Sequence, residues 1–254
     1  MATNNENYVL GRGEIWFKKD GDTAFRFIGN APTFNLNITS EKLEHFRSTR
    51  GVREKDTTFI LQTTRTANIV AEDINLDNLA LFFLGETLSV TQGALTAQTE
   101  TFNGVKLGYG YQVGVTALRP GGLRKLTTPV LKKGATVLVA GRDYNLDATR
   151  GWLEILPGGT LIDGDNVTLE FGVAANKRDQ VISGSNSVTG ELKFLAYNAE
   201  GNNIDYWLPY VEISPNGEYS LISENALQTL PLTLDVQTRG NLAAVYLDGQ
   251  AVVA

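Results

Sequence analysis

The sequence contains no cysteine and a single histidine, His45, so it lacks residue types on which several functions depend. Without cysteine there can be no disulfide, zinc–thiolate site or thiol nucleophile, and the chain is indifferent to the redox state of its compartment. A Ser-His-Asp triad would have to use His45, which lies in a strand-like segment. These absences predict a protein that is not an enzyme and that has no cofactor and no metal site.

Long hydrophobic runs are also missing. No segment approaches the roughly 18 apolar residues of a membrane-spanning helix, and the polar stretch from Met1 to Tyr8 has no apolar core of the kind found in signal peptides. We therefore expect a chain that is made soluble in a cytoplasm and does not insert into a membrane. The net charge of −6 argues against a protein that holds nucleic acid through its phosphates.

Charge and composition set the middle of the chain apart. Residues 87–180 contain ten Lys and Arg against eight Asp and Glu, a balance of +2, whereas the rest of the chain has twelve against twenty, a balance of −8. The middle segment also consists of short strand-like runs separated by glycine, and a Gly- and Ser-rich stretch follows it. We predict a discontinuous host domain, residues 1–86 and 181–254, with an inserted small β module at residues 87–180.

The host domain has the pattern of a mainly β fold. Residues 13–29 indicate a hairpin with turn residues at 20–22. In the next segment apolar and polar residues alternate, and this predicts a strand, extending to Phe46, with one face on a core and the other in water. The apolar set is Phe34, Leu36 and Ile38, and the polar set is Asn35, Asn37 and Thr39.

A charged segment, residues 47–56, separates this strand from a run rich in Thr, Ile and Val at residues 57–74. The two runs are expected to pair as one long hairpin with an exposed tip. Basic residues on a loop can indicate phosphate binding. Here, acidic residues lie between the basic ones and the segment has no aromatic residue to stack on a base, and both features favour contact with a protein. The predicted contact loop contains Arg47, Arg50, Arg53, Glu54, Lys55 and Asp56.

One helix is predicted after the hairpin, with Asn75 or Asp73 as its N-cap and Gly85 as its end. Its apolar face would carry Leu76, Leu79, Ala80 and Phe83. Further strands are expected at residues 191–197, 204–213, 218–222, 230–236 and 242–247. Pro231 cannot donate a backbone hydrogen bond, which suggests an edge or a bulge at that position.

One polar pattern has the spacing of a calcium-binding loop. Asp143, Asn145, Asp147 and Glu154 occupy positions 1, 3, 5 and 12 of an EF-hand-type loop. Position 6, however, is Ala148 instead of the glycine that the sharp turn requires, and both flanks have the composition of strands. We expect a plain hairpin here, with Asp and Asn forming its turn.

The order of these elements resembles that of the major tail tube proteins of long-tailed bacteriophages. Gly-Arg-Gly-Glu-Ile-Trp-Phe at 11–17, Phe-Ile-Gly-Asn-Ala-Pro-Thr-Phe at 27–34 and the helix at 79–85 are similar to the family's opening. Gly-Glu-Leu-Lys-Phe at 190–194, residues 210–219 and residues 230–236 are similar to its closing strands. Residues 143–164 are similar to a small Ig-like module of many tail subunits.

The resemblance implies a tail-tube-type β-sandwich or barrel with a flanking helix, six copies of which form a ring, and rings that stack into the hollow tail of a virion. The long hairpin would line the lumen, with Asn35, Asn37 and Thr39 as the candidates that face inward, and the contact loop would reach a neighbouring ring or subunit. The inserted module would lie outside the tube.

The same resemblance implies partners and a location. The partners would be other copies of the chain and the tape measure, tail terminator and distal tail or baseplate proteins. Genomic DNA would pass through the lumen without specific binding, and the protein would be made in the cytoplasm of a bacterial host.

Three alternatives stay open. The first is a related tail subunit, such as a terminator, distal tail or decoration protein. The second is a carbohydrate-binding or adhesin-like β module, suggested by the insertion and by Trp152 and Trp207. The third is an enzyme that would depend on His45 or on the pair Glu72 and Asp73.

Overall fold

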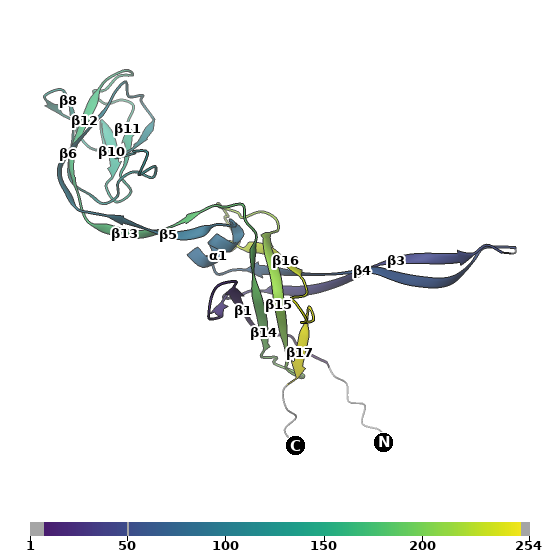
Figure 1. Cartoon of the computed structure of the whole chain (residues 1–254). Helices are drawn as coiled ribbons and strands as arrows, with labels where there is room; N and C mark the ends of the chain where they lie inside the picture. Colours follow the sequence, from purple (N-terminus) through teal and green to yellow (C-terminus); the bar gives the residue numbers. More distant parts are fainter. Residues whose placement is uncertain (1–7, 50, 250–254) are drawn as a thin grey trace. The chain divides into compact units, whose positions relative to one another are not determined.

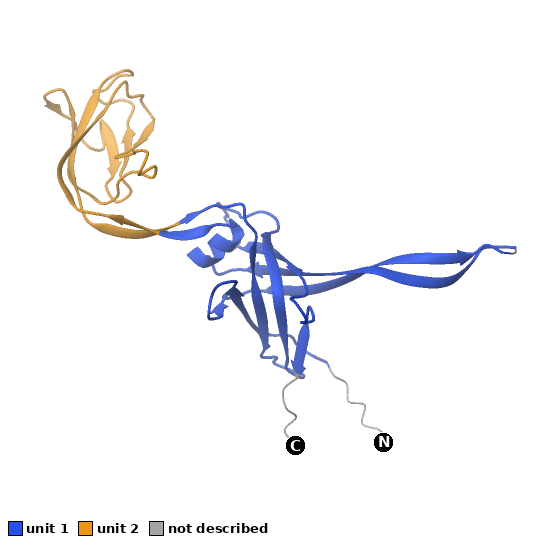
Figure 2. Cartoon of the chain, viewed as in Figure 1, with its two compact units in different colours: residues 1–88, 181–254 blue, residues 89–180 orange. Residues whose placement is uncertain are grey.

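The computed structural model describes residues 8–49 and 51–249 and has a mainly β fold with one helix in this part of the chain, as predicted. The chain forms two compact units, shown in Figure 2: unit 1 is Met1–Leu88 with Val181–Ala254, and unit 2 is Ser89–Gln180. The predicted boundaries are 86/87 and 180/181. The helix has seven residues, too few to cross a membrane, and the described residues contain no other.

Unit 1 is built on one antiparallel eight-stranded sheet with the order β2-β1-β14-β15-β16-β4-β3, in which β17 also pairs with β15 (Figure 1). Alternating apolar residues of these strands enclose a core that includes Phe17, Ile69, Leu192 and Leu208. The elements are β1 (Gly13–Lys19), β2 (Arg26–Phe27), β3 (Thr33–Arg47), β4 (Glu54–Ala71), α1 (Leu76–Phe82), β14 (Val188–Ala196), β15 (Ile204–Pro215), β16 (Leu230–Val236) and β17 (Tyr246–Gly249).

The helix α1 begins as predicted, but only part of the predicted apolar face is covered: Leu79 and Ala80 are half-buried, and Leu79 packs against the core. Asn75 is the N-cap and accepts a hydrogen bond from the backbone N–H of Asn78 (2.8 Å). Leu76 and Phe83 of the predicted apolar face are exposed, and the buried residues are Asn78 and Leu81. The Asn78 amide donates to the carbonyl oxygens of Ile28 (2.7 Å) and Asp73 (2.8 Å), so this polar residue ties the helix to the segments that follow β2 and β4.

Two expectations for the closing strands are wrong. Residues 218–222 form no strand, because this segment leaves the sheet after Gly217, whose φ of +115° interrupts extended backbone. Pro231 is not on an edge strand, since β16 lies between β15 and β4. The proline is tolerated because the ladder between β15 and β16 ends at the pair Pro215 and Leu232, one residue away.

Unit 2 consists of a three-stranded sheet, β10-β11-β7, and a four-stranded sheet, β6-β12-β8-β9, around its own core. Leu131, Leu153, Ile155 and Leu169 are among its fully buried side chains. Its strands are β6 (Leu95–Phe102), β7 (Gly110–Gln112), β8 (Leu126–Lys133), β9 (Thr136–Val137), β10 (Tyr144–Asp147), β11 (Trp152–Ile155) and β12 (Val167–Val173). The chain enters and leaves unit 2 through β5 (Glu86–Gln92) and β13 (Asn176–Ile182), which pair with each other.

Candidate functional site

The long hairpin of β3 and β4 extends beyond the strands that support it. The strand β16 pairs with β4 only from Thr66 to Ala71. Residues Glu54–Arg65 of β4 therefore pair with β3 alone, and β3 is itself the last strand of the sheet order. We call this part of the hairpin, Ile38–Arg47 with Glu54–Arg65, the distal ribbon; Figure 1 shows β3 and β4 running on together as two strands. Within the described residues, both of its edges are unpaired.

Unpaired edges of this length are unusual in a protein that acts alone. Each edge presents backbone N–H and C=O groups that can pair with another strand, so natural proteins shorten, charge or cover such edges. Here β3 spans 15 residues and β4 spans 18. An isolated two-stranded ribbon is also marginally stable in water. Both considerations point to a partner that covers the distal ribbon.

One face of the hairpin is polar. Asn35, Asn37 and Thr39 lie on the same face of β3, as the alternation predicts, and all three are exposed. They are paired in register with Asn68, Thr66 and Thr64 of β4, respectively. The face that carries the lumen candidates is thus built from amide and hydroxyl groups as far as Thr39. Glu41 and Leu43 continue the same face toward the end of the hairpin.

The opposite face departs from the prediction of a covered apolar side. Only Phe34 packs against the core of unit 1, whereas Leu36 and Ile38 are exposed, Ile38 by 57%. Ile38 is exposed because β3 and β4 run on beyond Thr66, where β16 stops pairing with β4. Leu36 still lies beside the supported part of β4, but on the last strand of the sheet.

Further exposed apolar residues follow along the distal ribbon. Leu43 and Phe59 lie opposite each other on the two strands, and their side chains are 53% and 54% exposed. Ile60 and Leu61 are also exposed. The register shifts at this point: Lys42 pairs with Ile60, so Leu61 is the extra residue of a β-bulge. The sequence-based prediction did not single out these positions. The three consecutive apolar residues at 59–61, which cannot all point to one buried face of a strand, were a signal that could have identified them.

The predicted contact loop is largely part of the ribbon. Arg47 ends β3, and Glu54, Lys55 and Asp56 belong to β4, so only Arg53 lies in the turn; Arg50 lies outside the described residues. Several of these charges are engaged within the hairpin: Lys55 pairs with Glu44, His45 Nδ1 lies 2.5 Å from Asp56 Oδ1, and the Arg53 guanidinium lies 5.3 Å from the centre of the Phe46 ring.

Exposed ion pairs of this kind contribute about 0–1 kcal/mol each. Their main effect is to hold the end of the hairpin in register. His45 is thereby placed in an exposed pair with a carboxylate at the far end of the ribbon.

The calcium-like pattern in unit 2 forms a plain hairpin, as expected, but Asp143 and Asn145 do not form its turn. The turn consists of residues 148–151, and Asn145 lies within the first strand. Tyr144–Asp147 and Trp152–Ile155 pair as β10 and β11. Asp143 is completely buried and accepts hydrogen bonds from the backbone N–H of Val139 (2.8 Å), the N–H and hydroxyl of Thr160, and the Arg142 guanidinium (2.8 Å). The Arg142 interaction, followed by the backbone donors, holds the pKa of the Asp143 carboxyl well below its usual range.

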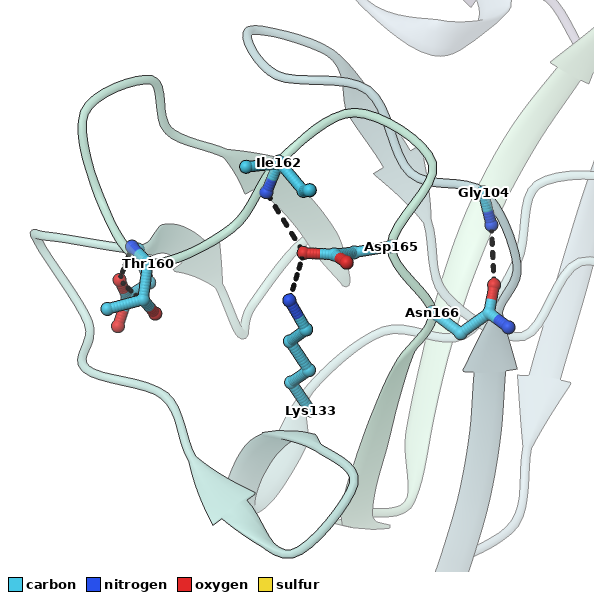
Figure 3. Close-up of polar contacts among 7 residues, drawn as sticks. Gly104, Lys133, Thr160, Ile162, Asp165 and Asn166 are labelled. Atoms are coloured by element: carbon cyan, nitrogen blue, oxygen red, sulfur yellow. Dashed lines mark hydrogen bonds and ion pairs between the residues drawn. The ribbon is translucent and has the colours of Figure 1, made fainter.

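A second carboxylate, Asp165, ties together the neighbouring loops in the same way (Figure 3). It accepts from the Lys133 ammonium (2.5 Å) and from the backbone N–H of Ile162 (2.9 Å), and the ammonium group lowers the pKa of the Asp165 carboxyl. These acidic groups are therefore occupied in closing loops. Among the residues that the structure describes, no group of three or more His, Cys, Asp or Glu is arranged to hold a metal ion.

The remaining candidates do not come together as one site. Glu72 accepts a hydrogen bond from the Asn30 amide (2.5 Å) at the end of β4. Trp207 lies on β15 of unit 1, where it stacks on Tyr246 with ring centres 5.1 Å apart. Trp152 lies on β11 of unit 2 and is 47% exposed.

Comparison with known proteins gives one informative result. A family model described as "Protein of unknown function UCP028589" matches residues 8–239, which include both units. A search of curated proteins found no match.

Proposed function

The chain belongs to the family whose model matches it over residues 8–239, and we propose that it is a structural subunit that assembles with copies of itself into rings through the distal ribbon. In this proposal the rings stack into the hollow tail tube of a bacteriophage virion, through which DNA is delivered to the host. The observation that carries the proposal is the pair of long unpaired edges on a ribbon with half-exposed apolar side chains.

The two edges fit a head-to-tail arrangement. The free edge of β3 on one copy can pair with the free edge of β4 on the next copy. If each copy is related to the next by the same rotation about the ring axis, the β4 strands of all copies run in the same direction. Because β3 and β4 are antiparallel within the chain, the new pair is antiparallel too. A head-to-tail contact forms a closed ring when its rotation closes, and a closed barrel has no free edge. The resemblance to tail tube proteins implies six copies per ring.

The two faces suit different surroundings. The face with Asn35, Asn37 and Thr39 carries amide and hydroxyl groups and the carboxylate of Glu41. It has no cation among these residues to hold DNA phosphates, which suits a lumen that lets DNA slide without binding it. The face with Leu36 and Ile38 would be covered by neighbouring copies, which removes exposed apolar surface from water. The tip with Arg47, Arg53 and Glu54 would meet the next ring or subunit. Tape measure, terminator and distal tail proteins are the further partners that the resemblance implies.

Electron microscopy of the purified chain is the first test. Long tubes are expected, whereas isolated rings would favour a terminator, distal tail or decoration subunit. A monomer at all concentrations would overturn assembly through the distal ribbon.

Crosslinking tests the pairing of edges directly, since the chain has no cysteine of its own. Two single-cysteine variants, Ser40→Cys on β3 and Thr63→Cys on β4, are treated with a short bismaleimide separately and as a mixture. Head-to-tail pairing predicts dimers in the assembled mixture and few in either variant alone. Efficient crosslinking of Ser40→Cys with itself would instead show a symmetric contact between two β3 strands and would contradict ring closure.

A further inference from the structure

The outer face of the three-stranded sheet in unit 2 carries an aromatic ring among polar side chains. In the register of this sheet, Trp152 lies between Asp147 and Gln112, and Glu154 lies between Asn145 and Gly110. Residues paired in register, and residues two apart along a strand, point to the same face. The inner face of β11 carries Leu153 and Ile155, which are fully buried. The six outward residues therefore form one surface, which we call the Trp152 platform.

The indole of Trp152 lies against Gly110. A β-carbon at position 110 would overlap the indole ring, and Gly110 has no positive φ that would require glycine for the backbone. The missing side chain at this position thus creates room for the ring to lie on β7. One side of the indole is covered by the strand, and the side chain remains 47% exposed to water.

The polar residues around the ring supply both donors and acceptors. The Asn145 amide donates to Glu154 (3.3 Å), and Asp147 accepts from the backbone N–H of Arg150 (3.0 Å) and pairs with its guanidinium (3.2 Å). The amide side chain of Gln112 is occupied by backbone carbonyls and by Arg124. Glu154 and Asn145 retain free hydrogen-bonding positions on their exposed sides, because a carboxylate and an amide can each make several bonds.

We propose that the Trp152 platform binds a carbohydrate. A pyranose ring has a face of C–H groups that can stack on the electron-rich face of an indole, and a rim of hydroxyl groups that both donate and accept hydrogen bonds. Glu154 and Asn145 are adjacent to the ring and can pair with such hydroxyls. A purely apolar ligand would leave these two groups unpaired.

A cationic peptide is the competing ligand, since Lys and Arg also bind over aromatic rings. The arrangement favours a neutral sugar because Asp147 already pairs with Arg150, whose positive charge lies at the edge of the platform. This inference concerns unit 2 and is independent of assembly through the distal ribbon.

The test uses the full-length chain and an array of oligosaccharides that contain glucose, galactose, rhamnose and N-acetylglucosamine, followed by calorimetry with any sugar that binds. Trp152→Ala should weaken binding at least about tenfold, the loss expected when an aromatic stacking partner is removed. Trp152→Tyr should restore part of it, and Glu154→Gln should weaken it several-fold. The matched control is Leu118→Ala, another exposed residue of unit 2, which should change nothing.

A second variant guards against misfolding. Gly110→Ala displaces the indole without removing it and should also weaken binding, while thermal melting of unit 2 reports whether each variant is folded. Absence of binding across the array, equal binding by folded Trp152→Ala, or tighter binding of a polylysine peptide than of any sugar would each overturn the proposal.

Discussion

Replacing two exposed apolar residues on the face of the distal ribbon that Ile38 shares with Leu36 tests the assembly surface quantitatively. In the double variant Ile38→Thr with Ile60→Thr, both side chains become smaller and polar, while threonine keeps a high preference for strands. Ile60 belongs to this face because it pairs with Lys42, four residues along β3 from Ile38. Because these residues are exposed in the single chain, the free energy of unfolding of the unassembled subunit should change by less than about 0.5 kcal/mol. The association of subunits should be weakened instead.

The expected magnitude follows from the exposed fractions. Full burial of an Ile side chain contributes about 1.5–3 kcal/mol. Ile38 and Ile60 are 57% and 65% exposed, so an interface that covers them removes more than half of each from water and contributes about 1 kcal/mol per residue. The double variant should lose about 2 kcal/mol per subunit contact, which raises the protein concentration needed for assembly about 30-fold.

Sedimentation velocity across a dilution series measures this concentration, and electron microscopy identifies the assembled species. The control variant, Leu118→Thr with Val137→Thr, makes the same kind of change at two exposed apolar residues of unit 2 and should assemble like the unaltered chain. Assembly of the ribbon variant at an unchanged concentration would refute the assignment of this surface.

Three further predictions concern the structure of each unit. Asn78→Ala removes the amide that bonds the carbonyls of Ile28 and Asp73 and should lower the free energy of unfolding of unit 1 in urea by about 2–4 kcal/mol; an unchanged midpoint would contradict this role. The depressed pKa of Asp143 stabilises unit 2 fully above about pH 4, and this contribution is lost as the pH falls toward the folded-state pKa. The Asp143→Asn variant should therefore have a lower melting temperature than the unaltered chain at pH 6. Its melting temperature should also fall less between pH 4 and pH 2 than that of the unaltered chain, and an equal fall in both proteins would refute the linkage. Leu153→Ala should destabilise unit 2 by about 2–5 kcal/mol in calorimetry yet leave the assembly concentration of the chain unchanged, and a parallel loss of assembly would show that unit 2 takes part in it.

Elements with a strong local pattern could be predicted from the sequence. The alternation of Leu230 to Val236 gives β16 with its observed bounds, and Asn75 is the predicted cap of α1. The division of β3 into two faces also follows, because Asn35 and Asn37 share a face as their spacing requires.

Features that depend on distant parts of the chain could not be predicted. Alternation distinguishes the two faces of β3 but does not say how far β16 extends alongside β4, and the exposure of Ile38 depends on where that pairing ends. Burial of Asn78 depends on the carbonyl of Ile28, which lies 50 residues away. The role of Asp143 similarly needs Thr160, 17 residues further along the chain, to be folded back beside it.

The pairing of β5 with β13 has a consequence for how such chains can diversify. The two strands bring the entry and exit of unit 2 next to each other, and the Gly184 N–H bonds the Phe83 carbonyl oxygen (3.1 Å) just before them. The chain therefore leaves unit 1 and re-enters it at neighbouring positions, and this does not depend on which domain is folded between them. Any domain with adjacent termini could be grafted between residues 88 and 181, so this ladder makes unit 1 a natural display scaffold and leaves unit 2 free to be exchanged by recombination.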